Sequence, residues 1–262
     1  MGRPLGQHFL RNPEISRRIV EALDLRSGDT VVEVGAGRGA LTRTLIESCK
    51  LKVDKLRITA IERDEKLAAD LGLRIKDQGF EIITGDALKI LPEVTQKFNG
   101  GYKLVGNIPY YITGKLLRVI GELEHKPEVT ILMIQKEVAE RVSAKSPRFN
   151  LLAASVQAWA EVEVLFQVSR REFKPMPKVE SAVVRLRLKT QDLRLRDEYY
   201  RLMKIIFKQP RKTILNNLSA GFDLPKEKLQ RVLRDAGINP SDRPQTLSVE
   251  LITKLARMLY NG

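Results

Sequence analysis

Short apolar runs alternate with helical patterns over the first 190 residues of the chain. The runs predict strands at residues 30–34, 57–61, 80–84, 102–105, 129–134, 163–168 and 182–188. Apolar residues that recur every three or four positions predict helices at residues 13–24, 65–75, 115–124 and 150–159, with two more beginning near residues 40 and 137. This alternation predicts an α/β fold with a doubly wound, mainly parallel sheet, in which the last two strands supply one antiparallel member.

The pattern changes after residue 190. Residues 190–196 are polar and charged, which indicates a linker, and the rest of the chain has only helical periodicity. The periodicity predicts helices at residues 197–207, 212–218, 226–236 and 248–260, with Gly237 as a stop signal. We therefore expect an α/β domain over residues 1–190 and a small all-helical domain over residues 191–262.

The composition indicates a soluble, intracellular protein without a metal. Of the 262 residues, 43% are hydrophobic, and no charge-free stretch reaches the roughly 20 residues that a membrane helix needs. The N-terminus lacks an apolar signal region, so we expect a cytoplasmic location. A single cysteine, Cys49, excludes an internal disulfide, and the two histidines, His8 and His125, lack metal-site spacing.

The charge points to a polyanionic partner. The net charge is +14, from 46 Lys and Arg against 32 Asp and Glu, and such an excess is typical of nucleic-acid binding. A solvated surface or a thermophile-like charge pattern is the alternative. Residues 1–11 are expected to form an irregular basic arm. The densest small basic cluster of the C-terminal part consists of Lys208, Arg211 and Lys212, which could contact a polyanion. The alternative is that these residues simply form the exposed start of a helix.

Three consecutive strand ends carry residues suited to a nucleoside. Gly35, Gly37 and Gly39 form a strand–turn–helix stretch in which the backbone can approach a ligand closely, although a dinucleotide site or a plain turn also fits. Glu62 can accept both hydroxyls of a ribose, or cap the next helix. Asp86 can accept from an adenine amine, or cap a turn. Together they predict a pocket for an adenosine-containing cofactor.

The fourth strand ends in Asn107-Ile108-Pro109-Tyr110, which suits a planar amino-purine. The Asn107 side-chain oxygen and the Ile108 carbonyl can each accept one hydrogen of an exocyclic amine, and Pro109 removes a competing donor. Such acceptors aim the nitrogen lone pair outward, and Tyr110 can stack on the ring. A plain strand-to-loop turn is the alternative.

A stiff loop lies between the last two predicted strands. Its prolines, Pro175 and Pro177, can hold Phe173 over a pocket mouth between the positive charges of Lys174 and Lys178. The alternative is that Phe173 simply covers the core.

Taken together, these stretches resemble the ribosomal RNA adenine N6,N6-dimethyltransferases of the KsgA type over nearly the whole chain. The stretches that carry the resemblance are Gly6-Gln7-His8-Phe9-Leu10, Glu33 to Gly39, Glu62, Gly85-Asp86, Asn107 to Tyr110, Phe173 to Val179 and Arg211 to Leu218. This chain has His8 where many members have Asn, and Met176 where many have a fuller proline run.

The resemblance implies a seven-stranded Rossmann-like methyltransferase sheet and S-adenosylmethionine as the cofactor. It implies dimethylation of two adjacent adenosines near the 3′ end of small-subunit rRNA, by a monomer that binds immature small ribosomal subunits. Cofactor contacts are expected from His8, Leu10, Gly35, Gly37, Glu62, Asp86 and Asn107. Catalytic roles are expected from Asn107, Ile108, Pro109, Tyr110 and Phe173.

Three other functions compete with this one. A large-subunit rRNA methyltransferase of the macrolide-resistance type shares the catalytic motifs and lacks only the C-terminal stretch. A nicotinamide-dependent dehydrogenase fits the glycine turn but leaves Asn107 to Tyr110 unexplained. A non-catalytic RNA-binding assembly factor fits the charge, but gives that stretch no purpose.

Overall fold

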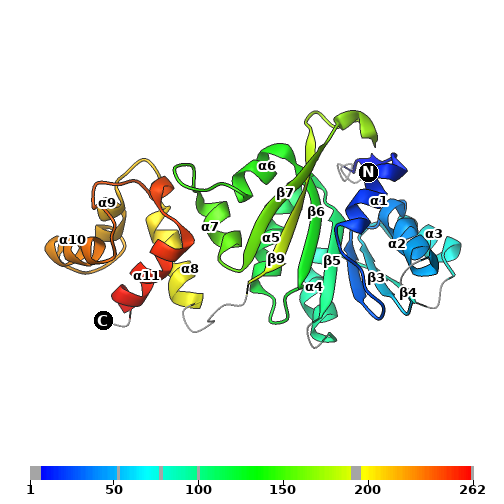
Figure 1. Ribbon diagram of the computed structural model, residues 1–262, viewed down its shortest axis with the longest axis horizontal. Coiled ribbons are helices and arrows are strands. Elements are labelled where there is room, and N and C mark those ends of the chain that lie inside the picture. Colours follow the sequence, from blue (N-terminus) through cyan, green and yellow to red (C-terminus); the bar gives the residue numbers. More distant parts are fainter. Residues whose placement is uncertain (1–6, 52–53, 77–78, 99–100, 190–195, 261–262) are drawn as a thin grey trace. The chain divides into compact units, whose positions relative to one another are not determined.

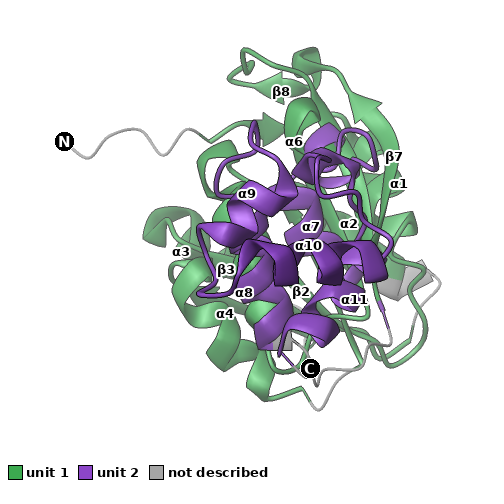
Figure 2. Cartoon of the chain, turned by 90° about the vertical axis from the view of Figure 1, so that its left-hand side faces the viewer, with its two compact units in different colours: residues 1–139, 161–188 green, residues 140–160, 189–262 purple. Residues whose placement is uncertain are grey.

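The chain folds into two compact units in a computed structural model. The structure describes residues 7–51, 54–76, 79–98, 101–189 and 196–260. One unit comprises residues 1–139 and 161–188, and the other comprises residues 140–160 and 189–262 (Figure 2). The predicted linker at residues 190–196 and the start of the basic arm, residues 1–6, lie almost wholly outside the described residues.

The first unit is built on a seven-stranded sheet flanked by helices, as the sequence predicts (Figure 1). The strand order is β4-β3-β2-β5-β6-β9-β7. The strands are β2 (Thr30–Val34), β3 (Arg57–Glu62), β4 (Phe80–Thr84), β5 (Tyr102–Asn107), β6 (Val129–Gln135), β7 (Ala160–Val168) and β9 (Ser181–Leu188). The helices are α1 (Pro13–Glu21), α2 (Ala40–Leu51), α3 (Glu65–Arg74), α4 (Ala87–Gln96), α5 (Thr113–Glu122) and α6 (Lys136–Val142), which crosses into the second unit.

The strand register gathers the predicted site at one edge of the sheet. β2 runs parallel to both neighbours, with Val34 opposite Ile61 of β3 and Gly106 of β5. Glu62 in turn lies opposite Thr84 of β4. Because parallel strands end at the same edge, the residues that follow β2, β4 and β5 meet there. β9 is the expected antiparallel strand, and its first residue, Ser181, pairs with Gln135 at that edge.

Side-chain caps mark where three helices of this unit begin. Asn12, Asp64 and Asp86 each accept a hydrogen bond from a backbone N–H of the first turn of α1, α3 and α4. The sequence pattern predicts no helix between residues 86 and 101. α4 forms there although it contains Pro92, a residue that normally interrupts a helix.

A two-stranded ribbon replaces part of the expected irregular arm. β1 (Phe9–Leu10) pairs antiparallel with β8 (Phe173–Lys174), with Phe9 opposite Lys174 and Leu10 opposite Phe173. The backbone N–H of Arg11 extends the ribbon by donating to the Glu172 carbonyl. The prediction was wrong here because two-residue strands carry no period that a sequence pattern can reveal.

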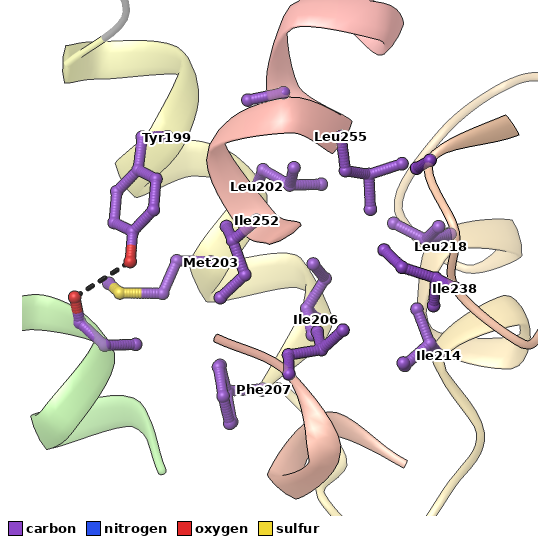
Figure 3. Close-up of a cluster of buried hydrophobic side chains, with 14 of the residues drawn as sticks. Tyr199, Leu202, Met203, Ile206, Phe207, Ile214, Leu218, Ile238, Ile252 and Leu255 are labelled. Carbon is purple, nitrogen blue, oxygen red and sulfur yellow. Dashed lines mark hydrogen bonds between the residues drawn. The ribbon is translucent and has the colours of Figure 1, made fainter. Parts of the chain in front are cut away.

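The second unit is helical and has a core of its own (Figure 3). Its helices are α7 (Leu151–Gln157), α8 (Arg196–Ile206), α9 (Ile214–Ser219), α10 (Lys226–Asp235) and α11 (Val249–Tyr260). Leu202, Ile206, Leu218 and Leu255 are buried in this core. α10 ends two residues before the predicted stop residue Gly237, whose φ of 81° is a conformation that glycine adopts readily.

Residues 140–160 pack with the C-terminal helices, although the sequence analysis assigns them to the α/β domain. Phe149, Ala153 and Ala154 belong to the second core, and the Tyr199 hydroxyl donates to the Ala154 carbonyl over 2.9 Å (Figure 3). The apolar face of α7 therefore packs into the core of the helical unit. Its position before residue 190 had indicated the core of the α/β domain instead.

No helix in the described part of the chain is long and apolar enough to span a membrane.

Candidate active site

A cavity of about 350 Å³ opens at the carboxyl edge of the sheet in the first unit. Its size is within the range typical of small-molecule sites. The ends of β2, β3, β4 and β5 and the β1–β8 ribbon contribute to its lining. Every predicted cofactor residue lines it: His8, Leu10, Gly35, Gly37, Glu62, Asp86 and Asn107. Ile108, Pro109 and Tyr110 line it too.

The backbone of the glycine turn adopts a conformation that favours glycine at two positions on the cavity wall. Gly35 and Gly37 have φ values of 76° and 56°, which side chains other than glycine rarely tolerate. A Cβ atom on Gly37 would lie 3.3 Å from the Phe9 ring, and one on Gly35 would lie 3.5 Å from the Asn107 carbonyl oxygen. The glycines thus let the turn lie against both β1 and the end of β5.

Glu62 is buried on the cavity wall, and backbone donors hold its carboxylate. One oxygen accepts from the Gly37 N–H over 2.7 Å, and the other accepts from the Asp64 N–H over 2.8 Å. Each oxygen keeps a further lone pair, so the group can still accept two hydroxyls. Asp64, and not Glu62, caps α3. Asp86 caps α4 through Leu88 and also lines the cavity.

Glu33 is a buried acid of the cavity lining that the sequence analysis does not select. Its pKa is raised to about 7, mainly by burial, against a hydrogen bond from Thr42 that lowers it and with a smaller contribution from the nearby Glu62 carboxylate that raises it. The Thr42 hydroxyl donates to the carboxyl oxygen over 2.7 Å. The sequence offered one signal for Glu33, because it is the only charged residue in a mainly apolar strand and lies two residues before Gly35.

The Asn107 amide has a defined orientation. Its nitrogen donates to the His8 backbone carbonyl over 3.1 Å, which leaves the amide oxygen as an acceptor. The Ile108 N–H donates to the Met133 carbonyl over 3.1 Å, and no donor among the described residues bonds to the Ile108 carbonyl. The structure thus brings together the two acceptors that the sequence analysis assigns to an exocyclic amine.

Tyr110 is half-buried and anchored on two sides. Its hydroxyl lies 2.8 Å from the Ser181 hydroxyl oxygen, and its ring centre lies 5.6 Å from that of His8. The His8 ring nitrogen Nδ1 donates to the Pro175 carbonyl over 2.8 Å. Burial raises the pKa of Tyr110, so its hydroxyl stays protonated at neutral pH. His8 therefore uses its carbonyl to hold Asn107 and its ring to contact Tyr110.

The predicted position of Phe173 over the pocket mouth is wrong. The ring is only 4% exposed, belongs to the core formed by α1, α2 and the sheet, and does not line the cavity. The next residue, Lys174, is exposed and does line it. Phe173 and Lys174 project to opposite sides of β8 because side chains alternate along a strand, and the Phe173 ring packs into the core.

Chemically, the cavity offers acceptors for a ribose and an amine beside an aromatic ring, rather than a metal centre. Among the described residues, no group of His, Cys, Asp and Glu side chains could hold a metal ion.

Comparison with known proteins identifies the family. The sequence pattern of the family described as ribosomal RNA adenine dimethylase matches residues 2–261. "Ribosomal RNA small subunit methyltransferase A" of Dehalococcoides mccartyi is 37% identical over 250 residues, which cover 94% of this chain and 84% of the relative.

Two solved structures share the fold over almost the whole chain. A dimethyladenosine transferase from Plasmodium falciparum has a TM-score of 0.79 and 27% identity, and the match covers 95% of this chain and 96% of that protein. The 23S rRNA methyltransferase ErmE has a TM-score of 0.76 and 27% identity, and the match covers 96% and 99% of the two chains. With a family match over 260 residues and this fold, the chain belongs to the ribosomal RNA adenine dimethylases.

Proposed function

We propose that this enzyme uses S-adenosylmethionine to dimethylate the N6 amines of two adjacent adenosines in small-subunit rRNA. The observation that carries the proposal is the Asn107 amide, whose oxygen remains an acceptor beside the Ile108 carbonyl at the cavity that Glu62 also lines. The D. mccartyi relative named for the small subunit supports this rRNA over the large-subunit rRNA of ErmE. The proposed partner is the immature small subunit, bound in the cytoplasm by one copy of the chain.

The residues present fit the cofactor. Glu62 would hold the ribose hydroxyls, Asp86 would accept from the adenine amine, and Gly35 and Gly37 would let the backbone contact the amino-acid part. The main reason to assign the cofactor to this cavity is the Glu62 carboxylate, each oxygen of which accepts only one backbone hydrogen bond. A buried acid with free lone pairs suits a ligand with two adjacent hydroxyls. His8 and Leu10 would close the cavity from the β1 side.

The chain's own part in the chemistry is positioning. When bound, S-adenosylmethionine supplies a methyl group on a positively charged sulfur, and the N6–carbon bond forms as the sulfur–carbon bond breaks. Asn107 and Ile108 would accept the two amine hydrogens and direct the nitrogen lone pair toward that methyl group. Tyr110 would stack on the extruded base and offset part of its unstacking cost. Water can take the proton that the methylated amine releases, so the site needs no general base.

Loss of the Glu62 carboxylate should weaken cofactor binding. Glu62→Ala removes an acceptor for the ribose hydroxyls, so affinity for S-adenosylmethionine should fall by about 1.5–3 kcal/mol, the usual value for hydrogen bonds to a charged group. Titration calorimetry of the folded variant would measure this. Glu81→Ala, at an exposed glutamate of β4, is the matched control. Equal affinities of Glu62→Ala and the control would remove Glu62 from the cofactor site.

We also infer that the helical unit contributes an RNA-binding surface. Lys208, Arg211 and Lys212 lie exposed between α8 and α9, before the Thr213 cap. Lys212, predicted as the first residue of a helix, lies outside α9. Each phosphate contact contributes about 0.7 to 0.9 to the slope of log affinity against log salt. Arg211→Ala with Lys212→Ala should therefore flatten the slope for small-subunit binding, and an unchanged slope would place the RNA surface elsewhere.

The direct test of the function is to incubate the protein with labelled S-adenosylmethionine and immature small subunits, then map the label. Dimethyladenosine at two adjacent positions near the 3′ end of the small-subunit rRNA is the expected result. Label in large-subunit rRNA alone would support the ErmE-like alternative, and binding without label would support a non-catalytic assembly factor.

A further inference from the structure

The β1–β8 ribbon has a second, exposed face whose use the cofactor site does not explain. Directly opposed residues of an antiparallel pair project to the same side. Leu10 and Phe173 form one such pair, and both are buried in the core. Phe9 and Lys174 form the next pair, so they project to the other side. Both line the cavity, which Leu10 also touches from its buried position. The ribbon thus presents an aromatic ring and an ammonium group at the cavity.

Arg38 adds a second cation to this face. Its guanidinium carbon lies 4.7 Å from the centre of the Phe9 ring, an arrangement that favours a fixed position for the charge. Arg43 holds the same stretch by donating from Nη1 to the Arg38 carbonyl over 2.8 Å. Arg38 sits in the glycine turn and lines the cavity with Phe9 and Lys174.

These two cations have no acidic partner in the part of the chain that the structure describes. Neither Arg38 nor Lys174 forms a salt bridge with any residue that the structure describes, and both are exposed. The buried acids of the cavity, Glu62 and Glu33, accept from backbone amides and from Thr42. The positive charge at the cavity mouth is therefore available to an anionic ligand.

An exposed aromatic ring lines the same cavity. Tyr111 is 56% exposed, and it follows Tyr110 in a short 3-10 helix, η1 (Tyr110–Ile112). Exposed aromatic rings beside cations are typical of surfaces that bind single-stranded nucleic acid, where each base can stack on a ring.

We propose that Arg38 and Lys174 bind the phosphates flanking the target adenosine and that Tyr111 stacks on a neighbouring base. The partner is single-stranded RNA at the point where one nucleotide leaves its stack. An extruded base can reach its pocket only if its backbone is held, and phosphate contacts supply that hold without reading sequence. The inference rests on the proposed function, because it takes the cavity to be the site that receives the target base.

Salt dependence tests the two cations. The probe is a fluorescent, adenosine-rich single-stranded RNA of 12 nucleotides, titrated over a range of salt concentrations. Arg38→Gln with Lys174→Gln should reduce the slope of log affinity against log salt by about 1.4, because each phosphate contact to a single strand contributes about 0.7. The matched control is Lys66→Gln with Lys89→Gln, which removes the same charge from exposed positions on α3 and α4 outside the cavity. The control should keep the wild-type slope.

Tyr111 is tested with the same probe. Tyr111→Ala should weaken binding roughly 5- to 140-fold, which corresponds to the loss of about 1–3 kcal/mol of stacking on one base. Its salt slope should stay at the wild-type value, and Tyr111→Phe should bind as the wild type does because the ring is kept.

Other results would overturn the inference. Equal slope losses in the paired variant and the control would mean that only the general field of the protein matters. The paired variant could instead keep the wild-type slope of log RNA affinity against log salt but bind S-adenosylmethionine more weakly in calorimetry. That result would assign Arg38 to the cofactor site. Failure of the wild-type protein to bind the RNA probe would also contradict the inference. The label mapping on small subunits is a separate measurement, so failure of the proposed function would be recognised independently.

Discussion

Asn107→Ala is expected to slow methyl transfer about 10²–10³-fold at saturating S-adenosylmethionine, as loss of one positioned transition-state partner does in other enzymes. The amide oxygen matters most while the target nitrogen becomes tetrahedral and its hydrogens become more acidic. The variant also loses the hydrogen bond to the His8 carbonyl, which orients the amide. Single-turnover transfer to immature small subunits, with products resolved by mass spectrometry, measures the effect.

Saturating cofactor separates this effect from any loss of cofactor affinity, since Asn107 lines the cavity close to both ligands. Asn150→Ala is a suitable control, because Asn150 caps α7 in the other unit and lies outside the cavity. A transfer rate near that of the wild type in Asn107→Ala would overturn the proposed mechanism.

The second large expected effect is a pH dependence of the free energy of unfolding, caused by the Glu33 carboxyl. Its carboxyl has a pKa of about 7 in the folded protein, against 4.5 as the ordinary value. Between these values the folded chain keeps a proton that the unfolded chain releases, so stability falls as pH rises through this window. The shift corresponds to about 3 kcal/mol between pH 4.5 and pH 7, with little further change above it.

Glu33→Gln cannot titrate, so it should lack this loss. Denaturant unfolding of the wild type and the variant at pH 5 and pH 8 would give the four free energies of unfolding. We expect the wild type to lose about 2.5 kcal/mol more than the variant between pH 5 and pH 8, because a small part of the effect falls below pH 5. The exposed Glu81→Gln should behave as the wild type does. Parallel pH dependence in the wild type and Glu33→Gln would show that the Glu33 carboxyl ionises normally.

The sequence predicts most of this site because parallel strands bring their ends together. Gly35, Glu62, Asp86 and Asn107 each follow or end an apolar run that is readable as a strand, and all of them line one cavity. The contacts that orient them were not predictable. His8 reaches Pro175 and Asn107 across the fold, and no local pattern encodes such pairing.

Phe173 shows where local reasoning fails. Stiffness and flanking charge indicate a ring held in the open, but the side that a residue faces depends on strand register. Pairing of Leu10 with Phe173 turns this ring into the core and Lys174 toward the cavity. Helix α4 was missed for a related reason, since the tertiary structure tolerates Pro92 against its local preference.

The helical unit draws its residues from two separate stretches of the chain, 140–160 and 189–262, and this matters for exchanging parts between relatives. A chimaera joined at residue 190 would leave Phe149, Ala153 and Ala154 of the parent facing a foreign set of helices. The side chains of a core are closely packed against one another, and changes in their volumes are destabilising. Such a chimaera would therefore combine core side chains from two proteins that do not fit together. During synthesis, the ribosome must likewise release α7 long before α8 and α11 emerge to cover it. Recombination that preserves this unit must therefore transfer both stretches together.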